Sequence, residues 1–358
     1  MFISVIIPVR NGGPLLVRCL QALNQTHYAH WECIVVEDGS EDNSAAVAYE
    51  HGARVMSGLR ACQGPAYARN VGAQVARGDI LFFLDADVLV QPGTVGHIAA
   101  TMQAGPTLAG CFGSYDTEPT EDNFLSQYRN LMHHFVHQHG RSEATTFWSG
   151  CGAIRQDLFL KYGGFNAALF GRPSIEDIEL GYRLHADAHP IRLEKLLQVT
   201  HMKRWTARQM VRTDFFDRAL PWTRLIIQSN FAPNDLNLQT SQRISTIAAY
   251  LLLLSLGGAI FSLWWLLLGA FSLATMVWLN REFYTFLRQE RGSRFMLKAL
   301  PWHWFYFIYS GAAFLLGFLL YGLLGLGRKE MAATRPSPLP SFTGKKPAPP
   351  PVSSASAP

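Results

Sequence analysis

Acidic side chains follow an apolar segment in the N-terminal part of the chain. Asp85 and Asp87 stand two positions apart, directly after the five apolar residues 80–84. Two carboxylates at this spacing can hold a hard divalent cation through oxygen ligands and leave positions open for a diphosphate. An ordinary polar loop is the alternative, but the apolar run predicts that the pair stands at the end of a buried strand. The sequence therefore predicts a Mg²⁺ or Mn²⁺ site at Asp85 and Asp87.

A second acidic pair, Glu176 and Asp177, opens a helical pattern that covers residues 175–184. The helix macrodipole favours an ionised carboxylate in the first turn of a helix. Asp177 is therefore a candidate general base for an acceptor hydroxyl, with helix capping as the alternative role. We expect Glu176 to orient the acceptor or to support Asp177.

Strand-like and helical patterns alternate around these residues. Apolar, strand-like runs cover residues 2–9, 31–36, 53–57 and 79–84, and helical patterns cover residues 14–23, 40–49 and 64–77. This alternation indicates an α/β domain with a mostly parallel sheet that is covered on both faces. In such sheets ligands bind beyond the carboxyl ends of the strands. We therefore expect the polar residues after three strands to converge on one crevice, namely Arg10, Asn11, Asp38, Asp85 and Asp87.

The chain of 358 residues, 49% of them hydrophobic, changes character near residue 237. Long apolar stretches dominate residues 244–327, as in membrane helices. Residues 244–279 would be about 54 Å long as one helix, against about 30 Å of hydrocarbon, so two spans fit better than one. A third span is predicted over residues 304–326. The predicted domains are a cytosolic domain at 1–236, a membrane domain with about three transmembrane helices at 237–330, and a disordered Pro/Ser/Ala-rich tail at 331–358.

The distribution of charge favours a membrane surface over nucleic acid. The formal net charge is +5. Basic residues cluster beside the apolar segments, at Arg281, Arg288, Arg291, Arg294 and Lys298. This placement is typical of proteins that contact anionic lipid. The five cysteines form no CxxC pair, and the N-terminus has no signal-peptide pattern. We therefore expect a multi-pass protein of the cell (inner) membrane whose first domain is cytoplasmic.

Four segments within residues 3–205 resemble, in order, the family 2 glycosyltransferases with the GT-A fold. They read ISVIIPVRN at 3–11, EDGS at 37–40, ARN at 68–70 followed by DAD at 85–87, and SIED at 174–177. The resemblance implies a nucleotide-sugar-binding GT-A fold followed by C-terminal transmembrane helices. It also implies an inverting, metal-dependent hexosyltransferase that uses a nucleotide-diphosphate sugar, with a UDP-sugar favoured.

By this resemblance several residues would bind the donor. Pro8, Arg10 and Asn11 belong to the first segment, and Arg10 stands where the family often has an aromatic residue that stacks on the base. A guanidinium can also stack, so the identity of the base stays open. Asp38 would accept hydrogen bonds from the base, with a helix cap as the alternative. Arg69 would lie near the base and the diphosphate.

The same resemblance separates the two acidic residues of the DAD segment. Asp85 would contact the ribose or the metal ion, and Asp87 would be the principal metal ligand.

The acceptor side is expected at two further segments. Residues 147–154 read FWSGCGAI, where Gly150, Cys151 and Gly152 would let the backbone approach the sugar closely. A buried glycine-rich strand edge is the alternative. Residues 201–205 read HMKRW and resemble the Gln-x-x-Arg-Trp motif of membrane polysaccharide synthases, with His in place of Gln. Trp205 would pack on the acceptor sugar and Arg204 would serve the departing diphosphate, unless this is only a basic juxtamembrane segment.

The sequence thus predicts transfer of a sugar to a membrane-proximal acceptor, a lipid or a lipid-linked sugar. Two alternatives remain open. One is a processive polysaccharide synthase, and the other is a non-catalytic, membrane-tethered scaffold that binds nucleotides. The acidic residues Asp38, Asp87 and Asp177 favour an enzyme.

Overall fold

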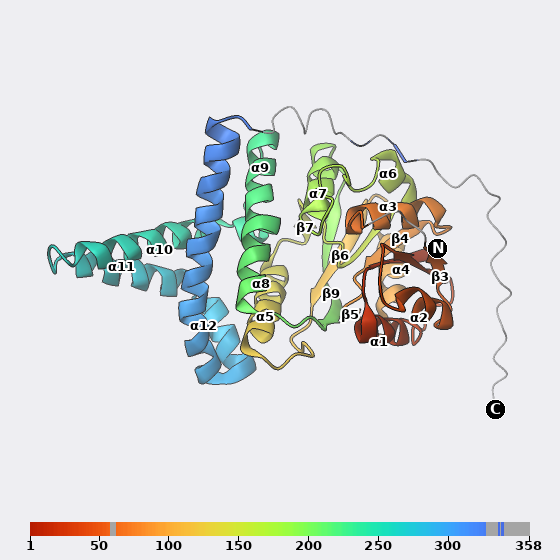
Figure 1. The fold of residues 1–358 in the computed structure, drawn as a ribbon, viewed down its shortest axis with the longest axis horizontal. Coiled ribbons are helices and arrows are strands. Elements are labelled where there is room, and N and C mark those ends of the chain that lie inside the picture. Colours follow the sequence, from red (N-terminus) through yellow and green to blue (C-terminus); the bar gives the residue numbers. More distant parts are fainter. Residues whose placement is uncertain (58–61, 327–335, 337, 340–358) are drawn as a thin grey trace. The chain divides into compact units, whose positions relative to one another are not determined.

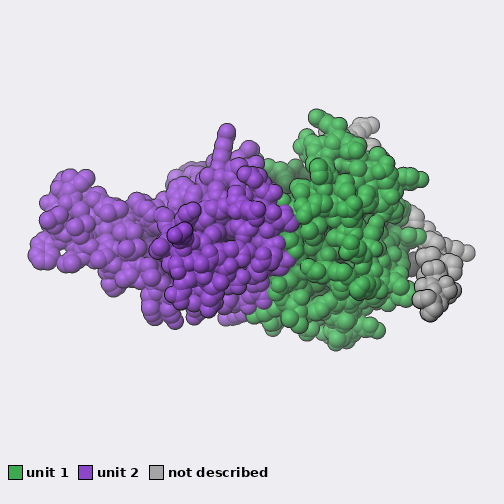
Figure 2. Space-filling model, turned by 90° about the horizontal axis from the view of Figure 1, so that it is seen from below, with its two compact units in different colours: residues 1–114, 142–202, 334–358 green, residues 115–141, 203–333 purple. Residues whose placement is uncertain are grey.

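The computed structural model describes residues 1–57, 62–326, 336, 338 and 339. Most of the predicted disordered tail, 331–358, lies outside these residues. The chain forms two compact units, coloured separately in Figure 2. Unit 1 comprises Met1–Ser114, Ser142–Met202 and Thr334–Pro358, and unit 2 comprises Tyr115–Arg141 and Lys203–Ala333. This division differs from the predicted boundary at residue 237.

Unit 1 contains the sheet. Its strands are β1 (Ile3–Val9), β2 (Trp31–Glu37), β3 (Arg54–Met56), β4 (Ile80–Leu84), β5 (Val88–Leu89), β6 (Gly110–Tyr115), β7 (Glu143–Ala144), β8 (Cys151–Arg155) and β9 (Ile191–His201). The strand order is β3-β2-β1-β4-β8-β6-β9-β5, and β7 pairs with β9. Strands β1 to β4 are parallel, as predicted, whereas β8 joins β4 in antiparallel orientation. The sheet is therefore mixed.

Helices cover this sheet (Figure 1). They are α1 (Gly13–Leu23), α2 (Ser44–Glu50), α3 (Pro65–Val75), α4 (Thr94–Ala104), α6 (Gln156–Lys161) and α7 (Glu176–Ala186). Strand β4 is buried along its whole length, and Phe83 packs against the rings of Phe147, Phe159 and Phe165. Burial of such a strand on both faces is what its uninterrupted apolar sequence predicts. The predicted α/β class is confirmed.

Unit 2 is helical. Its elements are α5 (Phe124–His139), α8 (Ala207–Arg212), the π-helix η1 (Thr213–Ala219), α9 (Leu220–Ser229), the 3₁₀-helix η2 (Leu236–Leu238), α10 (Thr240–Gly258), α11 (Trp265–Leu279), α12 (Arg281–Gly317) and the π-helix η3 (Phe318–Leu323). Helix α12 is interrupted at Gly292, whose φ of 82° and ψ of 170° are not helical. Only glycine adopts this backbone conformation readily, so α12 is two helices joined at residue 292.

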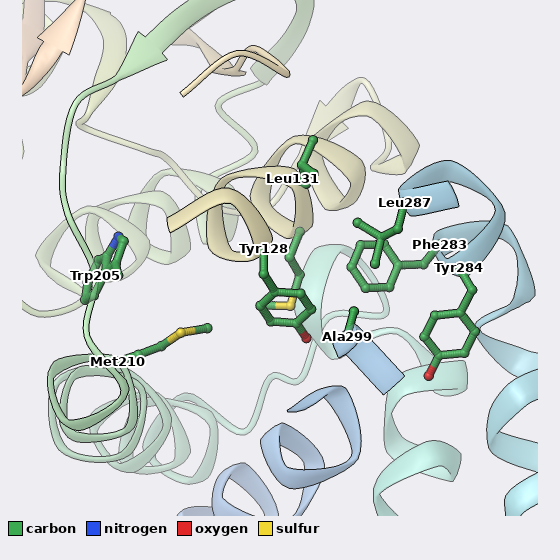
Figure 3. Packing of buried hydrophobic residues seen from close by; sticks show 9 residues of the cluster. Tyr128, Leu131, Trp205, Met210, Phe283, Tyr284, Leu287 and Ala299 are labelled. Carbon is green, nitrogen blue, oxygen red and sulfur yellow. The ribbon is translucent and has the colours of Figure 1, made fainter. Parts of the chain in front are cut away.

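Helix α5 belongs to unit 2 because of its packing. Its buried residues Tyr128 and Leu131 lie in one hydrophobic cluster with Phe283, Leu287 and Ala299 of α12 (Figure 3). Since these partners lie far along the sequence, the pattern of α5 alone does not reveal them. This long-range packing is why the units divide at residues 115 and 203 rather than at 237.

Within residues 1–57 and 62–326, one helix is long and apolar enough to cross a membrane by length and composition, the segment Arg281–Leu323. Three spans were predicted. The other two correspond to α10, whose first turn contains Gln242 and Arg243, and to α11, which has 15 residues. A helix of that length covers only about 22 Å, less than the hydrocarbon thickness.

Candidate active site

The carboxyl ends of β1, β2 and β4 lie at one edge of the sheet in unit 1. Val9 pairs with Glu37, and the backbone N–H of Asp38 donates to the carbonyl of Val9 at 2.9 Å. Strand β4 pairs with β1 on its other side. The three predicted strand ends are therefore neighbours, as expected for a ligand-binding edge.

Arg69 of α3 joins two of the acidic groups by charged hydrogen bonds. Its Nη2 lies 2.7 Å from Oδ1 of Asp85 and its Nη1 lies 2.9 Å from Oε1 of Glu176. The Arg69 side chain is buried, and its guanidinium lies 5.7 Å from the centre of the Phe165 ring. Burial acts to lower the pKa of Arg69, but the carboxylates of Asp85 and Glu176 hold this pKa above its ordinary value. Arg69 is therefore a permanently charged link between β4 and α7.

Glu176 is the buried end of this link. It is only 4% exposed, and its Oε2 accepts a hydrogen bond from the N–H of Ser174 at 3.0 Å. Burial raises the pKa of Glu176, and the charge of Arg69 opposes this effect. The structure thus shows Glu176 bound to Arg69, while its predicted contact with an acceptor stays a prediction.

Asp177, the next residue, is held in a different way. Its Oδ2 accepts hydrogen bonds from the N–H and the hydroxyl of Ser149 at 2.9 and 3.0 Å. Its Oδ1 accepts a hydrogen bond from the N–H of Ile178 at 2.8 Å. Ser149 was not among the predicted site residues. Its position directly before the glycine segment was the only sequence signal for it.

Asp85 and Asp87 follow β4 with partly open side chains, 33% and 25% exposed. His201, at the end of β9, places its Nε2 at 3.7 Å from Oδ2 of Asp87. Among the residues that the structure describes, no group of three or more His, Cys, Asp or Glu is arranged to hold a metal ion. Two accessible carboxylates nevertheless suit an ion that a substrate diphosphate also coordinates, because Mg²⁺ usually takes one or two carboxylates plus phosphates. The donor set fits the predicted cation.

Asp38 is buried and fixes the loop before α3. Its Oδ1 accepts a hydrogen bond from the N–H of Gln63 at 2.9 Å, and its Oδ2 accepts one from Gly64 at 2.7 Å. In place of the alternative role as a helix cap, the Asp38 carboxylate binds backbone N–H groups directly before α3, and its predicted contact with a base stays a prediction. These bonds use the same carboxylate that would accept hydrogen bonds from a base, so Asp38 can shape the base site through the loop at residues 62–64.

The loops after β1 and β2 are cross-linked at the same edge. The N–H of Asn11 donates to the hydroxyl of Ser40 at 3.0 Å, and its side-chain oxygen accepts from the N–H of Glu41 at 2.8 Å. Asn11 has a φ of 53°, a conformation that Asn tolerates better than most residues. Pro8 lies within β1, and Arg10 is exposed. Asn11 therefore orders the loop from which Arg10 extends.

The glycine segment leads into β8. The carbonyl of Gly150 accepts a hydrogen bond from the N–H of Asp85 at 3.2 Å, and Cys151 is fully buried. A Cβ at Gly152 would collide with the backbone oxygen of Trp148 and the ring of Phe147. The structure thus gives Gly152 a packing reason, and acceptor binding by this segment stays a prediction.

Arg204 and Trp205 lie in unit 2. Arg204 forms an ion pair with Glu121 at 3.1 Å. Trp205 is 5% exposed, its N–H donates to the hydroxyl of Ser126 at 2.7 Å, and its ring lies 5.6 Å from the guanidinium of Arg129. Figure 3 shows its indole next to Met210. In this structure Trp205 is a buried packing residue, and its predicted contact with an acceptor sugar stays untested.

The N-terminal part of the chain resembles known proteins. Residues 4–163 match the model of the family described as glycosyl transferase family 2. This part of the chain is a family 2 glycosyltransferase domain. The match covers β1 through β8, and therefore includes Asp38, Arg69, Asp85 and Asp87 but ends before α7.

Curated relatives of the glycosyltransferase domain carry related names. The chain is 31% identical over 231 residues to validoxylamine A glucosyltransferase of Streptomyces hygroscopicus subsp. jinggangensis, covering 54% of this chain and 53% of that protein. It is 27% identical over 194 residues to an uncharacterized glycosyltransferase of Haemophilus influenzae, covering 51% of this chain and 61% of that protein. The chain thus spans about half the length of the curated relatives it matches.

Among solved structures, the chain resembles a mannosyltransferase, PcManGT, from Pyrobaculum calidifontis. The TM-score is 0.57 at 16% sequence identity, and the alignment covers 87% of this chain and 86% of that one. The predicted GT-A-like fold is thereby confirmed.

Proposed function

We propose that this chain is an inverting glycosyltransferase that moves a hexose from a nucleotide-diphosphate donor to an acceptor hydroxyl. The observation that supports this most directly is the buried bridge from Asp85 through Arg69 to Glu176, with Asp177 next in sequence. The bridge fixes a donor-side carboxylate and a candidate base at a set position relative to each other. Such fixed positioning is what a displacement at one carbon requires.

Asp85 and Asp87 would hold the divalent cation, Mg²⁺ or Mn²⁺, together with the donor diphosphate. When bound, this ion would neutralise the charge that develops on the leaving group. The mannosyltransferase structure of similar fold was solved with GDP-Man and Mn²⁺, which is consistent with such a site. His201 lies next to Asp87 and is a candidate for orienting it.

Asp177 would take the proton from the acceptor hydroxyl, and the acceptor oxygen would then bond to the anomeric carbon. The bond from that carbon to the diphosphate breaks on the opposite side, so the nucleoside diphosphate leaves and the configuration inverts. The two hydrogen bonds from Ser149 fix the orientation of the Asp177 carboxylate. No carboxylate needs to act as a nucleophile, unlike in two-step retaining enzymes.

Asp38, Arg10 and Asn11 would form the base and ribose side of the donor site. They lie at the ends of the neighbouring strands β1 and β2. A UDP-sugar is our favoured donor, and the loop held by Asp38 would set the fit to the base. The glucosyltransferase name of one relative is consistent with a hexose as the transferred sugar.

The acceptor would be a lipid or a lipid-linked sugar. The exposed apolar helices of unit 2 support this part of the proposal, because they place an apolar surface in the same chain as the glycosyltransferase domain. We propose a protein of the cell membrane with more than one helix in the bilayer and its catalytic domain in the cytoplasm. Nucleic acid is not a proposed partner.

Incubation of the purified full chain with a panel of nucleotide sugars and a membrane-lipid extract tests this function. We expect metal-dependent release of a nucleoside diphosphate together with one sugar added per acceptor, with inverted configuration at the anomeric carbon. Retention of configuration would contradict the mechanism. A ladder of polymer lengths would instead favour a processive synthase, and donor binding without turnover would favour a scaffold.

A further inference from the structure

Helices α10 and α11 form a hairpin that is mostly apolar after the first turn of α10. The sequence has no Asp, Glu, Lys, Arg or His between Arg243 and Arg281. The two helices pack on each other, and in Figure 1 they extend together away from the other helices of unit 2. The hairpin therefore presents its remaining apolar surface outward.

The exposed side chains of the hairpin are unusually large and apolar. At the turn, Phe261 is 89% exposed, Ile260 83% and Trp264 78%. Further along the two helices, Leu253, Leu254, Leu256, Leu267, Phe271, Leu273 and Trp278 are also exposed. A continuous apolar surface of this kind marks an interface with a partner or a membrane.

The second half of α12 is also apolar, but it has a polar neighbour. The continuous helix α8–η1–α9 runs alongside the second half of α12 and η3, with Tyr309 of α12 bonded to Asp214 at 2.8 Å and Arg224 lying 5.6 Å from the ring of Tyr321 of η3. This neighbouring helix also carries Arg208, Arg212 and Arg218, all exposed. Inserting α12 across a bilayer would carry these guanidinium groups toward the hydrocarbon, which is costly. Composition alone makes α12 the candidate span, and its packing argues against that.

The direction of the helices separates insertion of the hairpin from insertion of α12. In Figure 1 the hairpin runs crosswise to α9 and to the second half of α12. If the hairpin enters a bilayer along its length, α9 and α12 lie along the membrane surface. The arginines of α8, η1 and α9 then reach the headgroups, while the exposed apolar side chains of α12 and η3, such as Leu315 and Leu319, rest at the boundary of the hydrocarbon.

The ends of the hairpin fit this orientation. Arg243 and Arg281 flank its base, where cationic side chains would meet headgroup phosphates. Trp264 and Trp265 stand at the turn, and tryptophan favours a membrane interface. Helix α10 from residue 244 to its end at Gly258 covers about 22 Å, and α11 covers a similar length. The apolar turn at 259–264 extends this reach within a hydrocarbon layer of about 30 Å.

We propose that the α10–α11 hairpin inserts into a lipid bilayer from one surface, with both of its ends on that surface, and that α8–η1–α9 and α12 lie flat on the same surface. Two helices enter the bilayer, not the three expected from sequence, and neither is the helix that composition singles out. This arrangement can be tested without any catalytic activity, because the test measures how deep labelled residues lie in a membrane.

Single nitroxide labels on matched leucines test the proposal. Leu254, four residues before the end of α10, and Leu315, two residues before the end of α12, are 56% and 57% exposed. Leu196 on β9, 81% exposed, serves as the control in water. Each is replaced by Cys in the full chain carrying Cys62→Ser, since Cys62 is the exposed cysteine of the described residues. The proteins are reconstituted in vesicles of phosphatidylcholine and phosphatidylglycerol.

Accessibility to oxygen, which concentrates in hydrocarbon, is compared with accessibility to a water-soluble nickel chelate. We expect Leu254→Cys to be accessible to oxygen and not to nickel, Leu196→Cys the reverse, and Leu315→Cys to lie between them at headgroup depth. A label at Leu315 as deep as that at Leu254 would overturn the proposal, since α12 would then cross. A label at Leu254 that the nickel chelate reaches as readily as the label at Leu196 would also overturn it. A label at Leu254 that is shielded from both reagents would do the same, because a second copy of the chain would then cover the hairpin.

The substitutions Leu254→Glu and Leu315→Glu give an independent measurement that does not need labelling. A carboxylate at the bilayer centre is costly, whereas one at the surface is tolerated. We expect Leu254→Glu to lower the fraction of protein that floats with vesicles and Leu315→Glu to leave it near that of the native chain. Equal losses from both variants would contradict the assignment.

Discussion

Ser149 donates both its backbone N–H and its hydroxyl to one carboxylate oxygen of Asp177, at 2.9 and 3.0 Å. The donors come from the segment before β8, while Asp177 stands in the first turn of α7. The orientation of the proposed base is thus set by a residue that does not itself move protons. This makes base chemistry and base orientation separable by mutation.

Asp177→Asn keeps the shape and the acceptor oxygen of the side chain but removes the base. We expect donor binding to survive and sugar transfer to fall by about 10²-fold or more, the usual contribution of general base catalysis. Calorimetric donor binding and transfer at saturating donor and acceptor check this.

Two further variants distinguish the roles around that base. Ser149→Ala should lower transfer less than Asp177→Asn, since it loosens the carboxylate without removing it. Asp38→Asn should weaken donor binding, and it should lower transfer mainly because less of the enzyme has donor bound. If Asp177→Asn transfers sugar at close to the native rate, Glu176 becomes the candidate base.

Arg69→Met should destabilise unit 1. It leaves the carboxylates of Asp85 and Glu176 without their cation, and breaking a buried ion pair in this way costs about 3–5 kcal/mol. A lower midpoint of thermal unfolding is the expected reading. The double variant Arg69→Met with Glu176→Gln should recover part of the loss, because one of the stranded charges is gone. No recovery would mean that the pair is not energetically coupled.

Asp87→Asn should abolish the dependence of donor binding on the divalent cation, because the site has few protein ligands to spare. Asp85→Asn should have a smaller effect on the metal dependence, since the Asp85 carboxylate already forms a salt bridge with the guanidinium of Arg69 at 2.7 Å. Titration of donor with and without chelator measures both effects. Donor affinity that is indifferent to chelator in the native chain would rule out the metal site.

Gly292→Ala should destabilise unit 2 by about 1–3 kcal/mol, the usual cost of forcing a residue with a side chain into such a backbone conformation. Gly257→Ala is the matched control, because a Cβ at either glycine meets no atom within 4 Å and only Gly292 has positive φ. The control should be neutral or stabilising by about 0.4–1 kcal/mol. Thermal unfolding of the two variants separates strain from crowding, and equal effects would argue against strain.

Much of the sheet could be predicted from the sequence because its strands are continuous apolar runs. The predicted strands at 2–9, 31–36 and 79–84 agree closely with Ile3–Val9, Trp31–Glu37 and Ile80–Leu84. The position of β8 between β4 and β6 could not be predicted, since antiparallel insertion depends on packing such as that of Gly152 against Trp148.

The positions of candidate site residues were predictable where the residue directly follows a strand, as at Asp38 and Asp85. The partners that orient those groups were not. Ser149 and the bond of Arg69 to Glu176 join segments that are distant in sequence. The same limit applies to the helices of unit 2, because hydropathy describes one helix and not the polar helix that packs beside it.

The chain passes between its two units at residues 114/115, 141/142 and 202/203, so neither unit is a single stretch of sequence. Helix α5 is synthesised long before α12, yet its residues Tyr128 and Leu131 are covered by Phe283 and Leu287 of that helix. During translation the apolar face of α5 stays uncovered until the C-terminal helices leave the ribosome. Unit 2 can therefore be completed only after α12 has been synthesised. A ribosome that stops near residue 237 would release a chain in which α5 lacks α12 as its packing partner.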